Sequence, residues 1–155
     1  MFINTCSGAI SLSKEIENES TKFYQDLAQK YERDKDLFLT FVKENGKFIM
    51  QIERAYYGVI TDALEGCFAF NLNSEDYKFK TNLSKDISYS KAMAEVLEME
   101  NKIIKFYQTA IEQSKLLMAD VPRSFILVAK KRSERILKLK TLLDNEEAKS
   151  EKVEK

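Results

Sequence analysis

Two glutamates beside predicted core stripes are the residues best placed to do chemistry in this chain. The segment EIENESTKFYQ spans residues 15–25, and EMENKIIKFYQ spans residues 98–108. Seven positions of the two segments agree, among them Glu17 with Glu100. In both segments apolar residues recur at helical spacing, and the shared glutamate adjoins that stripe. Carboxylates gathered near the core of a helical fold could bind cations through their oxygens.

Three polar residues interrupt the apolar stripes of two other helical segments. Asn45 falls between stripe positions of the second segment, and Arg132 and Arg135 fill two successive stripe positions of the fourth. One interpretation places all these residues on helix flanks, where Glu and Arg reach water and pair at the surface. The other brings two glutamates, two arginines and one asparagine to the middle of the fold. A buried charge without a partner is very costly, so buried arginines would need Glu17 and Glu100.

Helical periodicity covers most of the chain and predicts four helices. They are expected at about residues 7–31, 36–65, 90–119 and 122–147. Ser88 or Ser90 can cap the third helix, and Pro122 suits the first turn of the fourth. A stretch with glycine and asparagine, at about 66–89, predicts a long crossover loop between two helical hairpins. The expected fold is all-α, an up-down four-helix bundle over residues 1–147 with a charged, frayed tail at 148–155.

Composition narrows the class of function. The 155 residues carry 25 basic and 25 acidic side chains, a balance that indicates neither nucleic acid nor an anionic membrane as a partner. No stretch reaches the ~20 apolar residues of a membrane span, and the first residues do not resemble a signal peptide. Two cysteines, Cys6 and Cys67, are too few for a disulfide framework or a four-cysteine zinc site. We therefore expect a cytoplasmic protein with reduced thiols.

The pattern E-x-E-x(5)-F-Y, which opens each predicted hairpin, resembles the rubrerythrin branch of the ferritin-like superfamily. The similarity covers residues 9–143 apart from the crossover, and SFILVAKKRSERILKL is in register with that family's second-helix pattern. The resemblance implies a ferritin-like bundle in which each hairpin supplies a Glu from its first helix and E-x-x-H from its second. Those residues hold two irons that act on oxygen or peroxide. It assigns Glu17 and Glu100 to the first-helix ligands, with Tyr24 and Tyr107 close to them.

The second-helix ligands that the resemblance implies are missing. Asn45 and Phe48 stand in place of E-x-x-H in the first hairpin, Arg132 and Arg135 replace it in the second, and the chain has no histidine. The family's C-x-x-C iron–sulfur module is also absent. Carboxylates gathered without a metal repel each other, and a planar guanidinium can neutralise them. We predict that a Glu–Arg salt-bridge cluster replaces the metal centre and that the protein has no cofactor.

Two main functions are compatible with these residues. The first is a non-catalytic structural or interaction protein of unknown partner, which forms a homodimer through helix faces. An aromatic run could contribute to that dimer, although core packing is the other explanation for it: Phe38, Phe41, Phe48, Tyr56 and Tyr57. The alternative is an iron- or manganese-dependent oxidoreductase, or an iron- or oxygen-handling protein, with a carboxylate-only site. Its ligands would be Glu17, Glu44, Glu100 and Glu134.

A third hypothesis is a small-molecule pocket between the helices, near Ser13 and Ser20. These serines occupy stripe positions, and they are equally explained as core serines bonded to their own helix. Cys67 in the crossover is interpreted as a small buried or half-buried hydrophobic residue, because nothing near it in the sequence specifies a reactive thiolate.

Overall fold

Long helices dominate the part of the chain that the structure describes, residues 1–59, 68–116 and 120–154. In this computed structural model α1 spans Cys6–Lys30, α2 Lys35–Val59, α4 Tyr89–Ser114 and α5 Asp120–Glu154. The shorter elements are the 3-10 helices η1 (Glu32–Asp34) and η2 (Ser74–Tyr77) and the strands β1 (Phe2–Ile3) and β2 (Leu72–Asn73).

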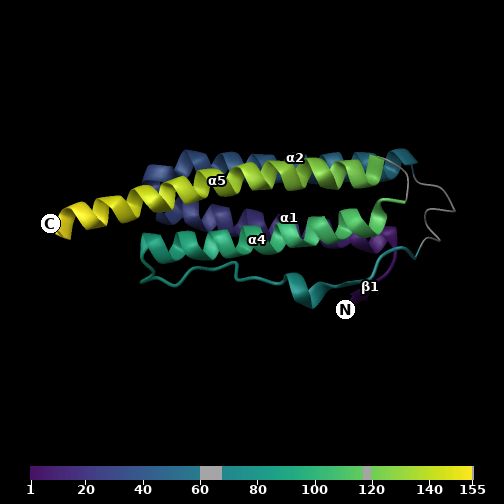
Figure 1. Cartoon of the computed structure of the whole chain (residues 1–155), viewed down its shortest axis with the longest axis horizontal. Coiled ribbons are helices and arrows are strands. Elements are labelled where there is room, and N and C mark those ends of the chain that lie inside the picture. The colour runs from purple at the N-terminus through teal and green to yellow at the C-terminus, as the bar shows by residue number, and fades with distance from the viewer. Residues whose placement is uncertain (60–67, 117–119, 155) are drawn as a thin grey trace.

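The four helices form two hairpins that pack into one bundle. η1 joins α1 to α2, these two helices pack along each other, and α4 and α5 do the same. The hairpins meet mainly through α2 and α5, and Figure 1 shows all four helices lying side by side along the long axis. The predicted all-α bundle of two hairpins is therefore confirmed.

The predicted apolar stripes face the interior of this bundle. Leu27 on α1, Phe38 on α2, Ile103 on α4 and Val128 on α5 each have an exposed fraction of zero. Burial of such stripes supplies most of the stability of a helical bundle, because helices in proteins are stabilised more by the packing of an apolar face than by intrinsic propensity. The core also fixes how each helix is rotated about its axis, and that rotation decides where the polar residues on the stripes point.

Local signals in the sequence define where the helices begin. The Thr5 hydroxyl accepts a hydrogen bond of 3.0 Å from the Gly8 amide at the start of α1. Ser88 rather than Ser90 caps α4 and accepts a bond of 3.3 Å from the Lys91 amide. Pro122 lies in the first turn of α5, where a missing N–H costs nothing.

Two helix ends differ from the prediction within the described residues. α4 ends at Ser114 and is followed by a turn at Lys115 and Leu116, although the third helix was expected to continue to about residue 119. α5 continues to Glu154, beyond the expected end near Glu147, and its exposed residues include Lys149. The charged composition that indicated a tail is equally compatible with a solvent-exposed helix, because glutamate and lysine have good helix propensity. The predicted end of the second helix at Glu65 and the interpretation of Cys67 fall outside the described residues.

The crossover is more ordered than the loop that the sequence predicted. β2 pairs with β1 in an antiparallel ladder that aligns Phe2 with Asn73 and Ile3 with Leu72. Leu72 and Tyr77 are buried, and the Tyr77 ring lies 5.2 Å from the ring of Phe106 on α4. Figure 1 shows the crossover running along the side of the bundle where α1 and α4 lie. A pairing of two residues is too short to produce a recognisable alternating pattern in the sequence.

Side chains of α1 bind the backbone of the crossover. Lys30 Nζ donates to the Ser84 carbonyl at 2.6 Å, and the Leu83 amide donates to Asp26 Oδ2 at 3.1 Å. These bonds satisfy backbone groups that have no strand or helix partner, so they keep an irregular segment in place. Within the described residues, no helix is long and apolar enough to cross a membrane.

Candidate functional site

The polar residues that interrupt the predicted stripes meet in the middle of the bundle. α1 contributes Glu17, α2 contributes Asn45, α4 contributes Glu100, and α5 contributes Arg132 and Arg135. The exposed fraction of each residue is 2% or less. The interpretation that placed them on water-exposed flanks is therefore wrong. We call these five residues the central cluster.

Arg132 connects both glutamates of the central cluster. Its Nε and Nη2 donate to Glu17 Oε1 and Oε2 at 3.2 and 2.5 Å. Its Nη1 donates to both carboxylate oxygens of Glu100, at 2.7 and 2.8 Å. One guanidinium thus spans the two hairpins and neutralises a carboxylate from each, with the two-pronged geometry that a planar fork allows.

Arg135 lies at the side of the cluster that faces α2. Its Nη1 donates to Asn45 Oδ1 at 2.9 Å and to Glu100 Oε1 at 3.3 Å, and Glu44 Oε1 lies 3.7 Å from Nη2. The guanidinium carbon lies 4.5 Å from the ring centre of Phe41, close enough for a cation–π contact. Its Nε has no hydrogen-bond partner among the described residues. Arg135 is therefore less fully paired than Arg132.

Each glutamate also accepts a hydrogen bond from a tyrosine of the other hairpin. Tyr24 on α1 donates to Glu100 Oε1 at 2.5 Å, and Tyr107 on α4 donates to Glu17 Oε1 at 2.7 Å. The repeat places each tyrosine seven residues after its own glutamate, two turns along the same helix. Each tyrosine therefore binds the glutamate of the opposite hairpin, and the two hydrogen bonds hold the hairpins together.

Asn45 links the arginines to α1 with both ends of its side-chain amide. Its Oδ1 accepts from Arg132 at 3.2 Å and its Nδ2 donates to Ser20 Oγ at 3.1 Å and Thr21 Oγ1 at 3.2 Å. Ser20 Oγ also accepts from Arg132 Nη2 at 3.3 Å. Ser20 and Thr21 therefore belong to the polar network around the central cluster. The sequence analysis did not predict this role for either residue. The available signal was the i, i+3 spacing of Ser20 from Glu17, which places both on one helix face.

The electrostatic surroundings keep the central charges in place at neutral pH. Burial by itself would raise the pKa of Glu100, but the charges of Arg132 and Arg135 and the Tyr24 hydrogen bond outweigh it, and the pKa lies below its usual range. Burial would lower the pKa of Arg132, yet Glu100 and Glu17 hold it well above its usual value.

The two tyrosines stay protonated for related reasons. Burial is the largest cause that raises the pKa of Tyr24, and the adjacent Glu100 raises it further. Burial and then Glu17 raise the pKa of Tyr107 in the same way. Their hydroxyl groups therefore remain hydrogen-bond donors to the carboxylates over the physiological pH range.

This donor set does not fit a dinuclear metal centre. Within the described residues, no group of three or more His, Cys, Asp or Glu is arranged to hold a metal ion. The guanidinium of Arg132 lies between Glu17 and Glu100, where a cation would have to sit. The alternative site made of Glu17, Glu44, Glu100 and Glu134 is not formed either. Glu134 is exposed on α5 and lies 3.8 Å from the ammonium group of Lys131, outside the buried cluster.

Phe48 and Ser13 border the central cluster without joining its hydrogen bonds. Phe48, which occupies a position of the missing E-x-x-H, is buried and lies 5.6 Å from the guanidinium carbon of Arg132. Ser13 is also buried, and its hydroxyl has no hydrogen-bond partner among the described residues. The predicted pocket at Ser13 and Ser20 is therefore occupied by protein side chains. Cys6, at the start of α1, is buried away from this site.

Comparisons with known proteins do not assign the chain to a family. No protein-family model, no curated protein and no solved structure gives a significant match to it.

Proposed function

We propose that this protein is a ferritin-like bundle in which a Glu–Arg cluster takes the place of a dinuclear metal centre, and that it acts as a non-catalytic structural or interaction protein. The observation that carries the proposal is the position of the Arg132 guanidinium. It donates hydrogen bonds to Glu17 and Glu100 from the two hairpins, and all three side chains have an exposed fraction of zero.

The arrangement of the repeat supports the ferritin-like part of the proposal. Glu17 and Glu100 occupy equivalent positions in the two halves and face each other across the bundle middle, with Tyr24 and Tyr107 beside them. These are the positions that the resemblance gives to the first-helix ligands and their tyrosines. Arg132 and Asn45, from the two second helices, reach the same centre.

The chemistry of the central cluster supports the non-catalytic part. Two glutamates and two arginines balance in charge, and the hydrogen bonds of Arg132 are directed at protein atoms. A catalytic centre needs a group that can accept or donate a proton, or a metal with an open position. Glu100 is held ionised and the tyrosines are held protonated, so these groups are poorly suited to proton transfer at neutral pH.

A measurement of bound metal tests the proposal. The untagged protein is produced in medium with added iron and manganese, and its metal content is measured by mass spectrometry, followed by an anaerobic titration with Fe(II). We expect far less than one metal per chain and no saturable binding of Fe(II) in the anaerobic titration. After air is admitted, we expect no oxidation of Fe(II) above the buffer rate. Close to two metals per chain would overturn the proposal.

A revertant provides the matched control. Asn45→Glu with Phe48→His, and Arg132→Glu with Arg135→His, restore E-x-x-H on both second helices. We expect this variant to retain iron or manganese under conditions where the natural sequence does not, since carboxylate and imidazole ligands replace the guanidinium groups. Metal binding by the revertant alone would show that the arginines, and not the bundle geometry, exclude the metal.

The predicted homodimer and the cytoplasmic location stay predictions. Four members of the aromatic run named for the dimer are buried, and Tyr57 is the one that is exposed, at 64%. Core packing therefore explains most of that run. Light scattering on the purified protein, with Tyr57→Ser as a comparison, would show whether the exposed face of α2 associates.

A further inference from the structure

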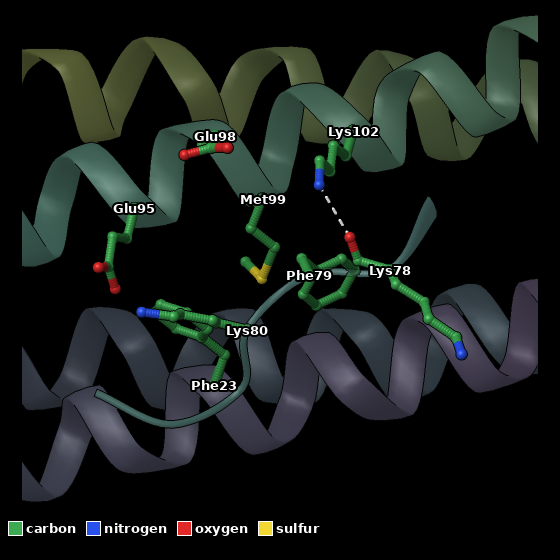
Figure 2. Close-up of a pocket in the computed structure, with 8 residues that line it drawn as sticks. All are labelled: Phe23, Lys78, Phe79, Lys80, Glu95, Glu98, Met99 and Lys102. Carbon is green, nitrogen blue, oxygen red and sulfur yellow. Dashed lines mark hydrogen bonds between the residues drawn. The ribbon is translucent and has the colours of Figure 1, made fainter. Parts of the chain in front are cut away.

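Two hollows flank the crossover, and neither specifies a ligand. Figure 2 shows the hollow beside α4, where Lys80 extends towards Glu95 and Lys102 Nζ donates a hydrogen bond of 2.8 Å to the Lys78 carbonyl. The hollow beside α1 also has charges of both signs in its lining: Met1 with its amino group, Lys78, Glu15 and Glu19. Neither hollow therefore selects a cation or an anion.

α2 carries a second stripe of residues that faces away from the bundle. Six residues spaced alternately by four and by three lie on this face, and we call them the outer seam: Leu39, Lys43, Gly46, Met50, Glu53 and Tyr57. This is the spacing of the contact positions in a coiled coil. All of them are exposed except Glu53, whose side chain is 30% exposed. Figure 1 shows the crossover along α1 and α4, on the other side of the bundle from α2.

Half of the outer seam is apolar although it faces water. The exposed fractions are 37% for Leu39, 59% for Met50 and 64% for Tyr57. A single exposed apolar side chain is ordinary in a folded protein. Three of them at the contact spacing of one helix form a stripe that a second helix can cover, and burial of their surface would favour association.

Gly46 in the middle of the outer seam is not explained by contacts within the chain. A Cβ atom added at this position would meet no other atom within 4 Å. Glycine inside a helix is less favourable than alanine, so a reason for it is expected. A glycine on a helix surface leaves a hole that a large side chain of a second helix can enter.

The outer seam is complementary to itself in shape. Two copies of α2 that pack antiparallel about a two-fold axis at the level of Phe48 bring together residues at equal distances on either side of Phe48. Leu39 and Tyr57 are each nine residues from Phe48, so each meets the other in the second copy. Gly46 and Met50 are each two residues from it, so Met50 of one copy meets the hole at Gly46 of the other.

The outer seam is also complementary to itself in charge. Lys43 and Glu53 are each five residues from Phe48, so the same register places Lys43 of each copy opposite Glu53 of the other. Lys43 has no ion pair within the described residues, and Glu53 contacts Lys14 at 2.6 Å through Oε1 alone. A parallel pair would instead set Lys43 against Lys43 and Glu53 against Glu53, and such like-charge contacts are unfavourable.

We propose that two copies of this chain form an antiparallel dimer through the outer seam, with Met50 of each copy against Gly46 of the other. The inference rests on the proposed role as an interaction protein but not on the central cluster, so the test of association and the test of bound metal can fail separately. One helix face buries a small area, and we therefore expect a weak dimer with a Kd on the order of 10 μM.

Sedimentation velocity of the full-length protein over a range of concentrations tests the proposal. Gly46→Leu fills the hole that Met50 of the second copy would enter, and it should weaken dimerisation about tenfold or more. Gly58→Leu is the matched control, because a Cβ atom at this position of α2 also meets no other atom within 4 Å and Gly58 is not part of the outer seam. It should leave the dimer unchanged, and circular dichroism checks that both variants are folded.

Exchange of the paired charges tests the register. Lys43→Glu creates two like-charge contacts and should weaken the dimer about tenfold. Adding Glu53→Lys restores opposite charges across the dimer, and adding Lys14→Glu keeps the surface pair within each chain, so this triple variant should recover most of the loss. The proposal is overturned if the natural protein stays monomeric at about 1 mM, if Gly46→Leu and Gly58→Leu associate equally, or if the triple variant associates no better than Lys43→Glu.

Discussion

Arg132 and Glu17 form a buried two-pronged ion pair, with Nε to Oε1 at 3.2 Å and Nη2 to Oε2 at 2.5 Å. The remaining nitrogen of the same guanidinium contacts both oxygens of Glu100. α5 thus joins α1 and α4 through a single side chain. This contact therefore ties the two hairpins together at the centre of the bundle.

Replacing Arg135 should cost less stability than replacing Arg132. Arg135→Met leaves Glu100 with its contacts from Arg132 and Tyr24, and the methionine can pack against Phe41. Removal of one partner from a buried ion pair is most costly when the other charge is left without a partner, and here Glu100 still has Arg132 as its partner. We expect a loss of roughly 1–2 kcal/mol in the free energy of unfolding, measured in urea. A loss as large as that of Arg132→Met would mean that the two arginines act as one unit.

Each tyrosine hydroxyl should contribute measurably through its bond to a carboxylate of the other hairpin. Tyr24→Phe and Tyr107→Phe each remove one such bond from a buried charge, so we expect a loss of about 1.5–3 kcal/mol per variant. Tyr57→Phe is the matched control, because its ring is exposed, and it should change stability by less than about 0.5 kcal/mol. Equal stability of Tyr24→Phe and Tyr57→Phe would show that the crossed bonds contribute little.

Acid should remove the stabilisation that Glu100 provides. The folded-state pKa of Glu100 lies below its unfolded value of about 4.3, so its contribution is fully present above that pH and is lost as the pH falls through the folded pKa. We therefore expect Glu100→Gln to be clearly less stable than the natural protein at neutral pH. This difference should shrink as the pH is lowered below about 4. Urea unfolding of both proteins at several pH values measures it, and a difference that does not change with pH would contradict the assignment.

Alkali should act on the tyrosines in the opposite sense. The folded-state pKa values of Tyr24 and Tyr107 are raised above the unfolded value of about 10, so their contribution is present below that pH and is lost as the pH rises through the folded values. We expect ultraviolet titration to show that Tyr24 and Tyr107 are among the phenols that ionise only as the bundle unfolds, together with Tyr89, whose pKa is raised to about 12. In Tyr24→Phe one of them should be missing. Ionisation of all phenols while the circular dichroism stays native would contradict this expectation.

Helical periodicity alone predicts that Arg132 and Arg135 face the core of the bundle. Arg132 and Arg135 stand on a stripe that continues from Phe125 to Leu139, and the structure buries all four. Glu17 adjoins its stripe rather than lying on it, and periodicity could not decide between a flank and the core. The arginines favoured the core without deciding the question, because a buried guanidinium needs a buried carboxylate. In the structure Glu17 is fully buried.

The remaining contacts depend on tertiary distances that the sequence does not encode locally. Tyr24 donates its hydrogen bond to Glu100 and not to Glu17 of its own helix, and this choice depends on how the two hairpins face each other. The Asn45 bond to Thr21 depends on the rotation of α2 against α1. The pairing of β1 with β2 joins two residues of each segment, which is too short for a periodic signal.

The most direct test of the central claim is the free energy of unfolding of Arg132→Met, alone and together with Glu17→Gln and Glu100→Gln. The single change leaves buried carboxylates without their main counter-charge, and we expect a loss of roughly 3–5 kcal/mol. The triple variant removes the charges from both sides, and it should recover much of that loss. If Arg132→Met is as stable as the natural protein, the guanidinium does not hold the two hairpins together and the account of this centre is wrong.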